Sequence, residues 1–288
     1  MKTSALKADY GVEISDIDIR SASPGELQEI VEMLSSHGAI VLRDQELDPE
    51  HLVAFTRLLG EPAYNPRKEV TLPGFPDIAV ISNKIVDGKP IGDPDAGTGW
   101  HFDMPYERRP GYYTLLYALE VPDEGSNTLL ADLCAAWDAL PEDRREEVSD
   151  LVLHHSYAQL ASFKNNTLTP EQRRRLPDVF HPLVRRHPHN GRLALRPCFG
   201  GCKGVLGIAN PAGLELIKEL VEFVTQERFI YSHKWRPRDL LVWDNNCTLH
   251  RGTPFDKKKY IRLVHRTWIQ SPEEHYRDSL NPVMGHAA

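Results

Sequence analysis

The stretch WHFDM at residues 100–104 places a histidine and a carboxylate two positions apart, at His101 and Asp103. Side chains alternate between the two faces of a strand, so residues two apart point the same way and can reach one metal ion. Phe102 then points to the opposite side, into packing. A short His-x-Asp pattern also arises by chance, so an ordinary polar pair at the end of a strand is the alternative.

A third metal ligand must come from elsewhere in the chain, which has 13 histidines. His250 stands out in LLVWDNNCTLHRGTPF, where an apolar strand and a turn at residues 244–246 precede it. We expect His250 at a strand edge near the open end of a barrel. Two histidines and one carboxylate with open positions suit Fe(II) that must also bind oxygen and a cosubstrate. Zinc accepts the same ligands, so a zinc-dependent hydrolase is a second interpretation.

Two arginines in YIRLVHRTWIQ, residues 260–270, suggest an anion-binding surface. In a strand, Arg262, Val264, Arg266 and Trp268 share one face, and the two arginines lie about 13 Å apart. Burying a guanidinium is costly unless it meets an anion, and arginine binds carboxylates through two parallel hydrogen bonds. We therefore expect a carboxylate-binding role beside the metal site. The alternative is a solvated face of an edge strand.

The elements that must position these side chains are mostly strands. Ser23, Pro24, Glu26 and Gly38 predict the start and end of one helix, and residues 48–60 repeat the pattern. Further helices are expected near Leu133, Thr169 and Asn210, and Asn190-Gly191 predicts a hairpin turn. Strands are predicted at residues 38–44, 77–83, 111–121, 127–132, 191–197, 239–245 and 260–270.

Composition narrows the class of protein. The chain has 288 residues, a formal net charge of −7 and four cysteines. There is no broad basic field for nucleic acid, no apolar run for a membrane or signal peptide, and too few cysteines for a disulfide framework. We expect one cytoplasmic domain over residues 1–288. The charged, proline-flanked stretch at residues 143–182 is predicted to be a helical insertion that forms a lid, or an exposed helix pair.

The chain resembles the taurine/2,4-dichlorophenoxyacetate dioxygenase family of Fe(II)- and 2-oxoglutarate-dependent oxygenases. The similarity covers nearly the whole chain, in the family's order. It runs through GAIVLRDQELDPEHLVAFTRLLGEP, WHFDM, EGSNTLLADLCAAWDAL, HPLVRRHPHNGRLAL, HKWRPRDLLVWDNNCTLHRGTP and RLVHRTW. The resemblance implies a mainly β fold with flanking helices, a double-stranded β-helix or jelly roll like that of the cupins. The strand-rich pattern agrees with this fold.

Carried over position by position, the resemblance implies that His101, Asp103 and His250 are the iron ligands. It implies that Thr128 and Arg262 bind 2-oxoglutarate, with Arg262 on the distal carboxylate, and that Arg266 holds the acidic group of the prime substrate. The carboxylate at Asp103 argues against halogenation, because related halogenases lack it. The plausible substrate-pocket residues are Asn83, Tyr106 and Trp243. His155 and His265 are expected to be core or surface histidines.

The implied reaction is hydroxylation of an unactivated C–H bond in a small acidic substrate, with O₂ as oxidant and succinate and CO₂ as co-products. Desaturation, cyclisation or oxidative cleavage of a carbon–heteroatom bond stay open, and a catalytically silent binding protein would not need all three ligands. Residues 60–70, GEPAYNPRKEV, lack the histidine–tyrosine arrangement of taurine-type pockets, and Gly97 and Gly99 stand before Trp100. We therefore expect a carboxylate or sulfonate other than taurine. Family members are often dimers or tetramers, so a homo-oligomer is a further expectation.

Overall fold

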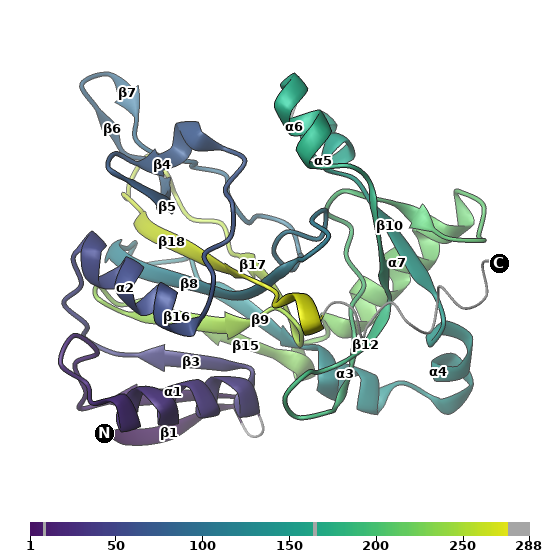
Figure 1. Cartoon of the computed structure of the whole chain (residues 1–288), viewed down its shortest axis with the longest axis horizontal. Helices are drawn as coiled ribbons and strands as arrows, with labels where there is room; N and C mark the ends of the chain where they lie inside the picture. The colour runs from purple at the N-terminus through teal and green to yellow at the C-terminus, as the bar shows by residue number, and fades with distance from the viewer. Residues whose placement is uncertain (8–9, 164–165, 276–288) are drawn as a thin grey trace.

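The computed structural model describes residues 1–7, 10–163 and 166–275, and one large sheet dominates it (Figure 1). The strands of this sheet are β1 (Lys2–Lys7), β2 (Tyr10–Ser15), β3 (Ala39–Leu42), β4 (Thr71–Leu72), β5 (Phe75–Ser82), β8 (Gly111–Glu120), β16 (Leu240–Asp244) and β18 (Leu263–Gln270). They lie in the order β1-β2-β3-β16-β8-β18-β5-β4. Only β2 and β3 pair in parallel; the other neighbours are antiparallel.

Smaller sheets complete the β structure. A second sheet has the order β15-β9-β17, from β9 (Thr128–Asp132), β15 (Ile230–His233) and β17 (Thr248–Gly252). A third has the order β11-β10-β14, from β10 (Val152–His155), β11 (Val179–Pro182) and β14 (Cys202–Val205). Two strand pairs remain, β6 (Ile85–Val86) with β7 (Lys89–Pro90) and β12 (Val184–Arg186) with β13 (Leu193–Leu195). The predicted turn at Asn190-Gly191 joins the second pair.

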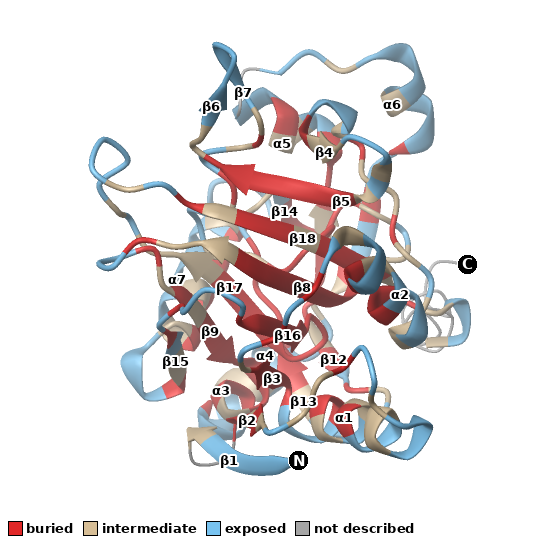
Figure 2. Cartoon of the chain, turned by 90° about the vertical axis from the view of Figure 1, so that its left-hand side faces the viewer, coloured by how far each residue is buried: buried red, intermediate tan, exposed pale blue. Residues whose placement is uncertain are grey.

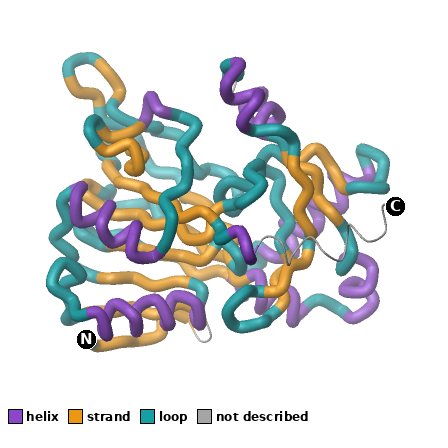
Figure 3. Tube along the Cα trace, in the orientation of Figure 1, coloured by secondary structure: helices purple, strands orange, loops and turns teal. Residues whose placement is uncertain are grey.

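The helices lie at the periphery of these strands (Figure 3). They are α1 (Pro24–His37), α2 (Pro49–Leu59), α3 (Leu133–Ala139), α4 (Glu142–Val148), α5 (Tyr157–Phe163), α6 (Pro170–Arg175) and α7 (Ala212–Val224), with 3-10 turns η1 (Lys68–Val70) and η2 (Glu227–Phe229). Within the described residues, every helix is too short or too polar to span a bilayer.

The two N-terminal helices begin and end where the sequence predicts. The Ser23 hydroxyl accepts from the backbone N–H of Glu26, and the Glu26 carboxylate accepts from that of Ser23, which completes a capping box. Asp48 accepts from the His51 N–H at the start of α2. Gly38 ends α1 with a φ of 78°, a conformation that glycine adopts without steric cost.

The central strands are buried on both faces (Figure 2). In β3, Ile40 and Leu42 join the apolar cluster under α1 and α2, whereas Ala39 and Val41 face the interior of the β structure. The same alternation in β16 sends Leu241 and Trp243 inward. The interior, between the large sheet and β9, is therefore the space toward which alternate side chains of β8, β16 and β18 point. The mainly β architecture with external helices is the predicted one.

The insertion at residues 143–182 differs from its predicted form. It holds α5, α6 and most of α4, but β10 and β11 lie within it and pair antiparallel. β10 also pairs with β14, a strand that the sequence analysis did not identify. The helical prediction was therefore only partly right. The charged residues of this stretch favour an exposed helix pair. The apolar residues between them instead form β10, which pairs with the distant strand β14.

Candidate metal and cosubstrate site

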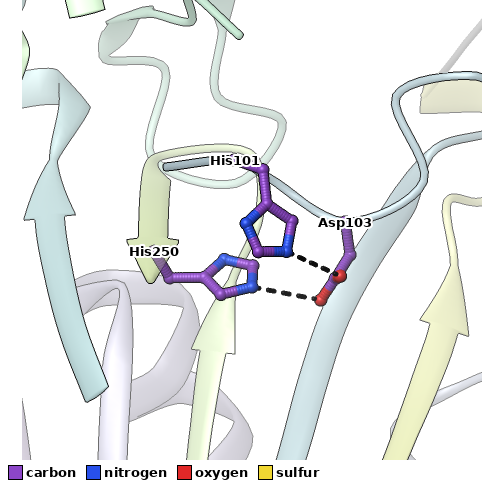
Figure 4. Close-up of side chains that lie close together, drawn as sticks. All are labelled: His101, Asp103 and His250. Carbon is purple, nitrogen blue, oxygen red and sulfur yellow. Dashed lines mark ion pairs between the residues drawn. The ribbon is translucent and has the colours of Figure 1, made fainter. Parts of the chain in front are cut away.

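Two backbone hydrogen bonds bring His101 beside His250, and Figure 4 shows their side chains together with that of Asp103. His250 lies within β17, and His101 lies in the loop before β8. The two residues form an isolated antiparallel bridge with each other. The sequence analysis assumed that strand alternation turns His101 and Asp103 the same way. In the structure, the bridge to His250 holds His101 in place of a regular strand. The two imidazole rings lie 4.2 Å apart between centroids. Phe102 is buried on the other side, with the Arg196 guanidinium 4.2 Å from the centre of its ring, as predicted.

The side chains of His101, Asp103 and His250 face one common point. Asp103 Oδ1 lies 3.7 Å from His101 Nε2, and Asp103 Oδ2 lies 3.6 Å from His250 Nε2. Both separations exceed hydrogen-bond length, so the three groups converge without satisfying one another. Their ligand atoms all lie within 4.8 Å of one another. This is the spacing expected of ligands around one ion.

The protonation states suit metal binding. His101 Nδ1 lies 2.8 Å from the Gly99 carbonyl oxygen and donates to it, which makes Nε2 the nitrogen that carries the lone pair a metal would bind. Burial opposes ionisation of Asp103, but nearby positive charge, with Arg266 as its permanent cation, outweighs burial and lowers the pKa of Asp103 to about 2. Burial lowers the pKa of His250 well below its ordinary value, so its imidazole is neutral. A carboxylate with two imidazoles is a donor set for Fe(II) with three further positions open.

A second group of potential ligands, His187, Asp244 and Cys247, does not resemble an open site. His187 Nε2 donates to Asp244 Oδ2 over 3.0 Å, and Asp244 Oδ1 accepts from both the backbone and side-chain nitrogens of Asn246. These atoms already satisfy one another. We read the group as a buried hydrogen-bond network that holds the turn between β16 and β17.

Arg262 is a buried cation beside the histidine strand. Its side chain is only 7% exposed, and Nε is buried without a partner. Among the described residues, its guanidinium has no hydrogen bond or ion pair. Burial and the nearby Arg266 lower its pKa to about 10. A buried guanidinium in this state calls for an anionic ligand.

Gly252 connects Arg262 to the metal-site strand. It lies two residues after His250, and a Cβ placed on it would be 3.7 Å from Arg262 Nη1. Gly252 is also the cross-strand partner of Thr128. Thr128 is buried, and its hydroxyl accepts from Trp235 Nε1 over 3.1 Å, which leaves its own proton free to be donated. Thr128 and Arg262 thus both lie beside Gly252, which is two residues, about 7 Å along the strand, from His250.

Arg266 lies on the inner face of β18, with Val264, as the alternation predicts. Its guanidinium carbon lies 4.1 Å from the centre of the Trp268 ring, and its Nε is buried without a partner. Thr267 points the opposite way, toward Thr56 of α2. Burial lowers the pKa of Arg266, and the nearby Asp103, Asp93 and Tyr106 oppose this lowering.

An aromatic wall beside Arg266 is formed by an apolar cluster from several segments. Tyr106 packs 4.7 Å, ring to ring, from Tyr157 of α5. Its members are Ala63, Ala79, Met104, Tyr106, Tyr157, Leu176 and Trp268, with Leu160 and Leu168 packed against them. Tyr106, a predicted pocket residue, therefore belongs to the surface beside Arg266.

The other two predicted pocket residues have structural tasks. Asn83 donates to the Lys257 and Tyr260 carbonyl oxygens and accepts from the Arg262 N–H over 2.9 Å, so its polar atoms anchor the loop before β18. Trp243 is buried in the interior, with its ring 4.5 Å from that of His250. It supports the histidine from behind. Local sequence could not separate these roles from ligand binding, because the contacts join distant segments.

Sequence reasoning missed Thr114, Gly252, Trp235 and Asn245. Asn245 was noted only as a turn residue, although both of its side-chain polar atoms contact the segment of Asp103 or its partner Thr114. Its place directly after an apolar strand and near His250 was the available signal. Thr114 lies in a run of apolar strand residues, GYYTLLYALE, and offers no sequence signal apart from its hydroxyl. His155 and His265, which were expected in the core or at the surface, are both buried.

The insertion reaches across to the segment that follows α2. Gln172 Nε2 donates to the Pro66 carbonyl oxygen over 3.0 Å. The Arg175 guanidinium carbon lies 3.9 Å from the centre of the Tyr64 ring. Together with the Tyr106–Tyr157 contact, these interactions hold the insertion against one side of the aromatic wall.

Comparison with known proteins agrees with this geometry. A family model described as taurine catabolism dioxygenase TauD, TfdA family matches residues 2–268. An alpha-ketoglutarate-dependent 2,4-dichlorophenoxyacetate dioxygenase of Cupriavidus pinatubonensis is 34% identical over 263 residues, which are 86% of this chain and 90% of that one. An (S)-phenoxypropionate/alpha-ketoglutarate-dioxygenase of Sphingobium herbicidovorans is 29% identical, over 87% of this chain and 88% of that one.

Among solved structures, AAD-2 in complex with Mn(II) and N-oxalylglycine matches with a TM-score of 0.82 and 28% identity. The match covers 94% of this chain and 99% of that chain. The residues matched by the family model, 2–268, include His101, Asp103, His250 and both arginines, Arg262 and Arg266.

Proposed function

This chain belongs to the TauD, TfdA family of dioxygenases, and from that premise we propose that it oxidises a small carboxylic or sulfonic acid with an apolar, aromatic body. It is an Fe(II)- and 2-oxoglutarate-dependent dioxygenase that uses O₂ and acts on a small organic substrate. The substrate class, the site residues and the lid are the parts that we propose.

In this proposal His101, Asp103 and His250 bind the iron, and Arg262 with Thr128 binds the distal carboxylate of 2-oxoglutarate. The observation that carries it is the buried, unpaired guanidinium of Arg262 across Gly252 from Thr128. A carboxylate there gives Arg262 the anion it lacks. A zinc hydrolase with the same three ligands has no need for this cation.

When bound, iron and 2-oxoglutarate activate O₂, and the cosubstrate leaves as succinate and CO₂ while a substrate C–H bond is oxidised. The protein orients the reactants and excludes water from the site. Gly252 leaves room above the strand between His250 and Arg262, and Thr128 can donate its proton to the cosubstrate. The aromatic wall of Tyr106 and Trp268 excludes water from the side where Arg266 lies.

The proposed substrate follows from the combination of one arginine with an apolar surface. Arg266 offers a guanidinium to an acidic group, and its stacking on Trp268 holds it in place. Rings and aliphatic groups around it suit an aryl or branched alkyl body. The relatives named for phenoxyacetate and phenoxypropionate substrates support an aryloxy acid.

The test is succinate formation from 2-oxoglutarate under air, with Fe(II) and ascorbate. Phenoxyacetate should stimulate turnover, while phenoxyethanol, which has the same ring and ether without the carboxylate, should not. Equal stimulation by the two compounds contradicts the acidic substrate. No succinate in any condition, from folded and iron-loaded protein, contradicts the assignment of the site.

The products separate the possible outcomes of the oxidation. Hydroxylation at the carbon next to an ether oxygen gives an unstable hemiacetal, so phenoxyacetate should release phenol and glyoxylate. A stable hydroxylated acid, an alkene or a new ring would instead indicate simple hydroxylation, desaturation or cyclisation. Mass spectrometry of the reaction mixture distinguishes all four.

We also propose that the chain is one domain over residues 1–288 in which residues 143–182 act as a lid. The contacts of Gln172 and Arg175 with the segment after α2 support the lid. Four buried free cysteines support a reducing, cytoplasmic location. A homo-oligomer remains a prediction, which light scattering tests.

A further inference from the structure

A chain of polar side chains contacts Asp103 from β8 and from the turn after β16. The Thr114 hydroxyl donates to Asp103 Oδ2 over 2.6 Å. Asn245 Nδ2 donates to the same Thr114 hydroxyl over 2.9 Å. Asn245 Oδ1 accepts from the backbone N–H of Asp103 over 3.0 Å. Asn245 and Thr114 therefore hold both the backbone and the carboxylate of Asp103.

The direction of each hydrogen bond follows from counting donors and acceptors. The Asp103 N–H can only donate, so Asn245 must turn its oxygen toward it and its NH₂ toward Thr114. Trp243 Nε1, also a donor, lies 3.3 Å from the same Asn245 oxygen and fixes this orientation further. The Thr114 oxygen already accepts from Asn245. Its single proton is therefore directed to Asp103 Oδ2.

The fold keeps this arrangement dry and rigid. Thr114 lies in β8 on the inward-facing side, since Leu116 of the same face packs in the interior and Leu115 packs under the helices. Thr114 and Asn245 are both fully buried. Hydrogen bonds in such surroundings are strong, and an acceptor that loses its donor is left unsatisfied.

The two oxygens of Asp103 consequently differ. Oδ2 accepts the Thr114 proton and lies 3.6 Å from His250 Nε2, while Oδ1 lies 3.7 Å from His101 Nε2 and has no hydrogen bond among the described residues. A carboxylate free to rotate could bind a metal through both oxygens. A carboxylate whose Oδ2 is held by a hydrogen bond offers mainly Oδ1 to the metal.

We propose that Thr114 is a positioning residue that holds Asp103 for metal binding through one oxygen, with Asn245 directing its proton. This rests on the proposed role of Asp103 as a metal ligand. Binding through one oxygen keeps the remaining metal positions for 2-oxoglutarate and O₂. Without the Thr114 hydroxyl, Asp103 loses a preferred orientation and can occupy a second position.

The test compares Thr114→Val, which removes the hydroxyl at nearly constant shape, with Thr114→Ser, which keeps it. Co(II) alone is titrated into each metal-free protein by calorimetry, and the visible absorption of bound Co(II) reports the coordination number. Thr114→Val should weaken Co(II) binding about 10- to 100-fold and change the absorption bands. Thr114→Ser should stay within about threefold of the unaltered protein, with unchanged bands.

Thr267→Val is the matched control. Thr267 is a buried threonine in the neighbouring strand β18, hydrogen-bonded to Thr56 under α2 and not to the site. Its loss should lower thermal stability and leave Co(II) binding unchanged. A change in Co(II) binding as large as that of Thr114→Val would mean that general destabilisation is the cause, and would overturn the proposal.

The proposal is also overturned if Thr114→Val binds Co(II) with the affinity and bands of the unaltered protein. If Thr114→Val does not fold, Thr114→Ala and Thr114→Ser are compared, because both lack the methyl group and differ only in the hydroxyl. Equal Co(II) binding by that pair overturns it. Failure of the proposed function is separate: the unaltered protein would then form no succinate, whatever the Co(II) titrations give.

Discussion

His101 and His250 donate their backbone N–H groups to each other's carbonyl oxygens, over 3.1 and 2.8 Å. This reciprocal pair joins the loop before β8 to β17 through backbone atoms alone. We therefore expect the fold itself to form the site, so that metal binding adds to an existing geometry.

Metal removal should leave the fold intact. Treatment with a chelator should not change the far-ultraviolet circular dichroism, and added metal should raise the melting temperature by mass action. His101→Ala should abolish Fe(II) binding and turnover while its spectrum stays native, because the backbone bridge does not need the imidazole. Unfolding of the metal-free protein would contradict a preformed site.

We expect Arg262 to be needed for 2-oxoglutarate binding and to destabilise the ligand-free protein. Arg262→Met should raise the KM for 2-oxoglutarate by about 100-fold or more, the cost of losing one partner of a buried charge pair. It should also raise the unfolding free energy of the ligand-free protein by about 1 kcal/mol or more, since an uncompensated buried charge is removed. Steady-state kinetics and urea unfolding measure the two effects.

Arg251 offers a matched control for that variant. It follows His250 in β17 and so points to the opposite face, where its guanidinium carbon lies 5.1 Å from the centre of the Trp100 ring. Arg251→Met should leave the KM for 2-oxoglutarate within about twofold of the unaltered value. Equal effects of the two substitutions would contradict the assignment of Arg262.

Gly252 should be needed for space rather than for backbone conformation. A Cβ there would meet the Gly97 carbonyl oxygen at 3.6 Å and Arg262 Nη1 at 3.7 Å, which are ordinary contacts. Gly252→Ala should therefore fold normally but raise the KM for 2-oxoglutarate roughly tenfold, because the methyl group fills the space assigned to it. Gly25→Ala, where a Cβ meets nothing within 4 Å, is the control and should change neither property.

Stability should fall with pH below neutrality because neutral histidines are buried. Burial lowers the pKa of His265 to about 4. Its unfolded value is about 6.5, so the unfolded chain binds a proton first as the pH falls. Stability is therefore complete above about pH 6.5 and lost toward pH 4, by about 2 kcal/mol between pH 7 and pH 5 for this group.

Urea unfolding at pH 7 and pH 5 checks this loss. His265→Gln should reduce the difference between the two pH values, whereas His37→Gln, at an exposed position of α1, should not. An unchanged difference in His265→Gln would mean that other groups, such as His181, whose pKa burial lowers to about 3, dominate the acid response.

The lid should depend on the contact between Arg175 and Tyr64. Arg175→Ala removes a guanidinium that lies 3.9 Å from the ring centre and should cost about 1 kcal/mol of lid closure. We expect faster proteolysis within residues 143–182 and more succinate formed per product molecule, because water reaches the site. Arg173→Ala, on the same helix, is the control. If the ratio of succinate to product and the rate of proteolysis are the same in both variants, the proposal that residues 143–182 act as a lid is wrong.

The helix boundaries were predictable because capping is local. Ser23 with Glu26, Asp48 and Gly38 each act on backbone groups within a few residues, so sequence alone determines where α1 and α2 begin and end. The same holds for the faces of β18, where strand alternation put Arg266 opposite Thr267. The types of the three metal-site residues and of the two arginines were also readable, since such side chains are unusual within or next to apolar strands.

Only the tertiary structure decided which polar side chains face the site and which serve the framework. Asn83 and Trp243 looked like pocket residues, yet long-range contacts use them to hold a loop and a histidine ring. Thr114 looked like a strand residue, yet β8 brings its hydroxyl to Asp103. Sequence determines what each side chain can do, but its partner is chosen by chain segments that meet only when the sheets pack.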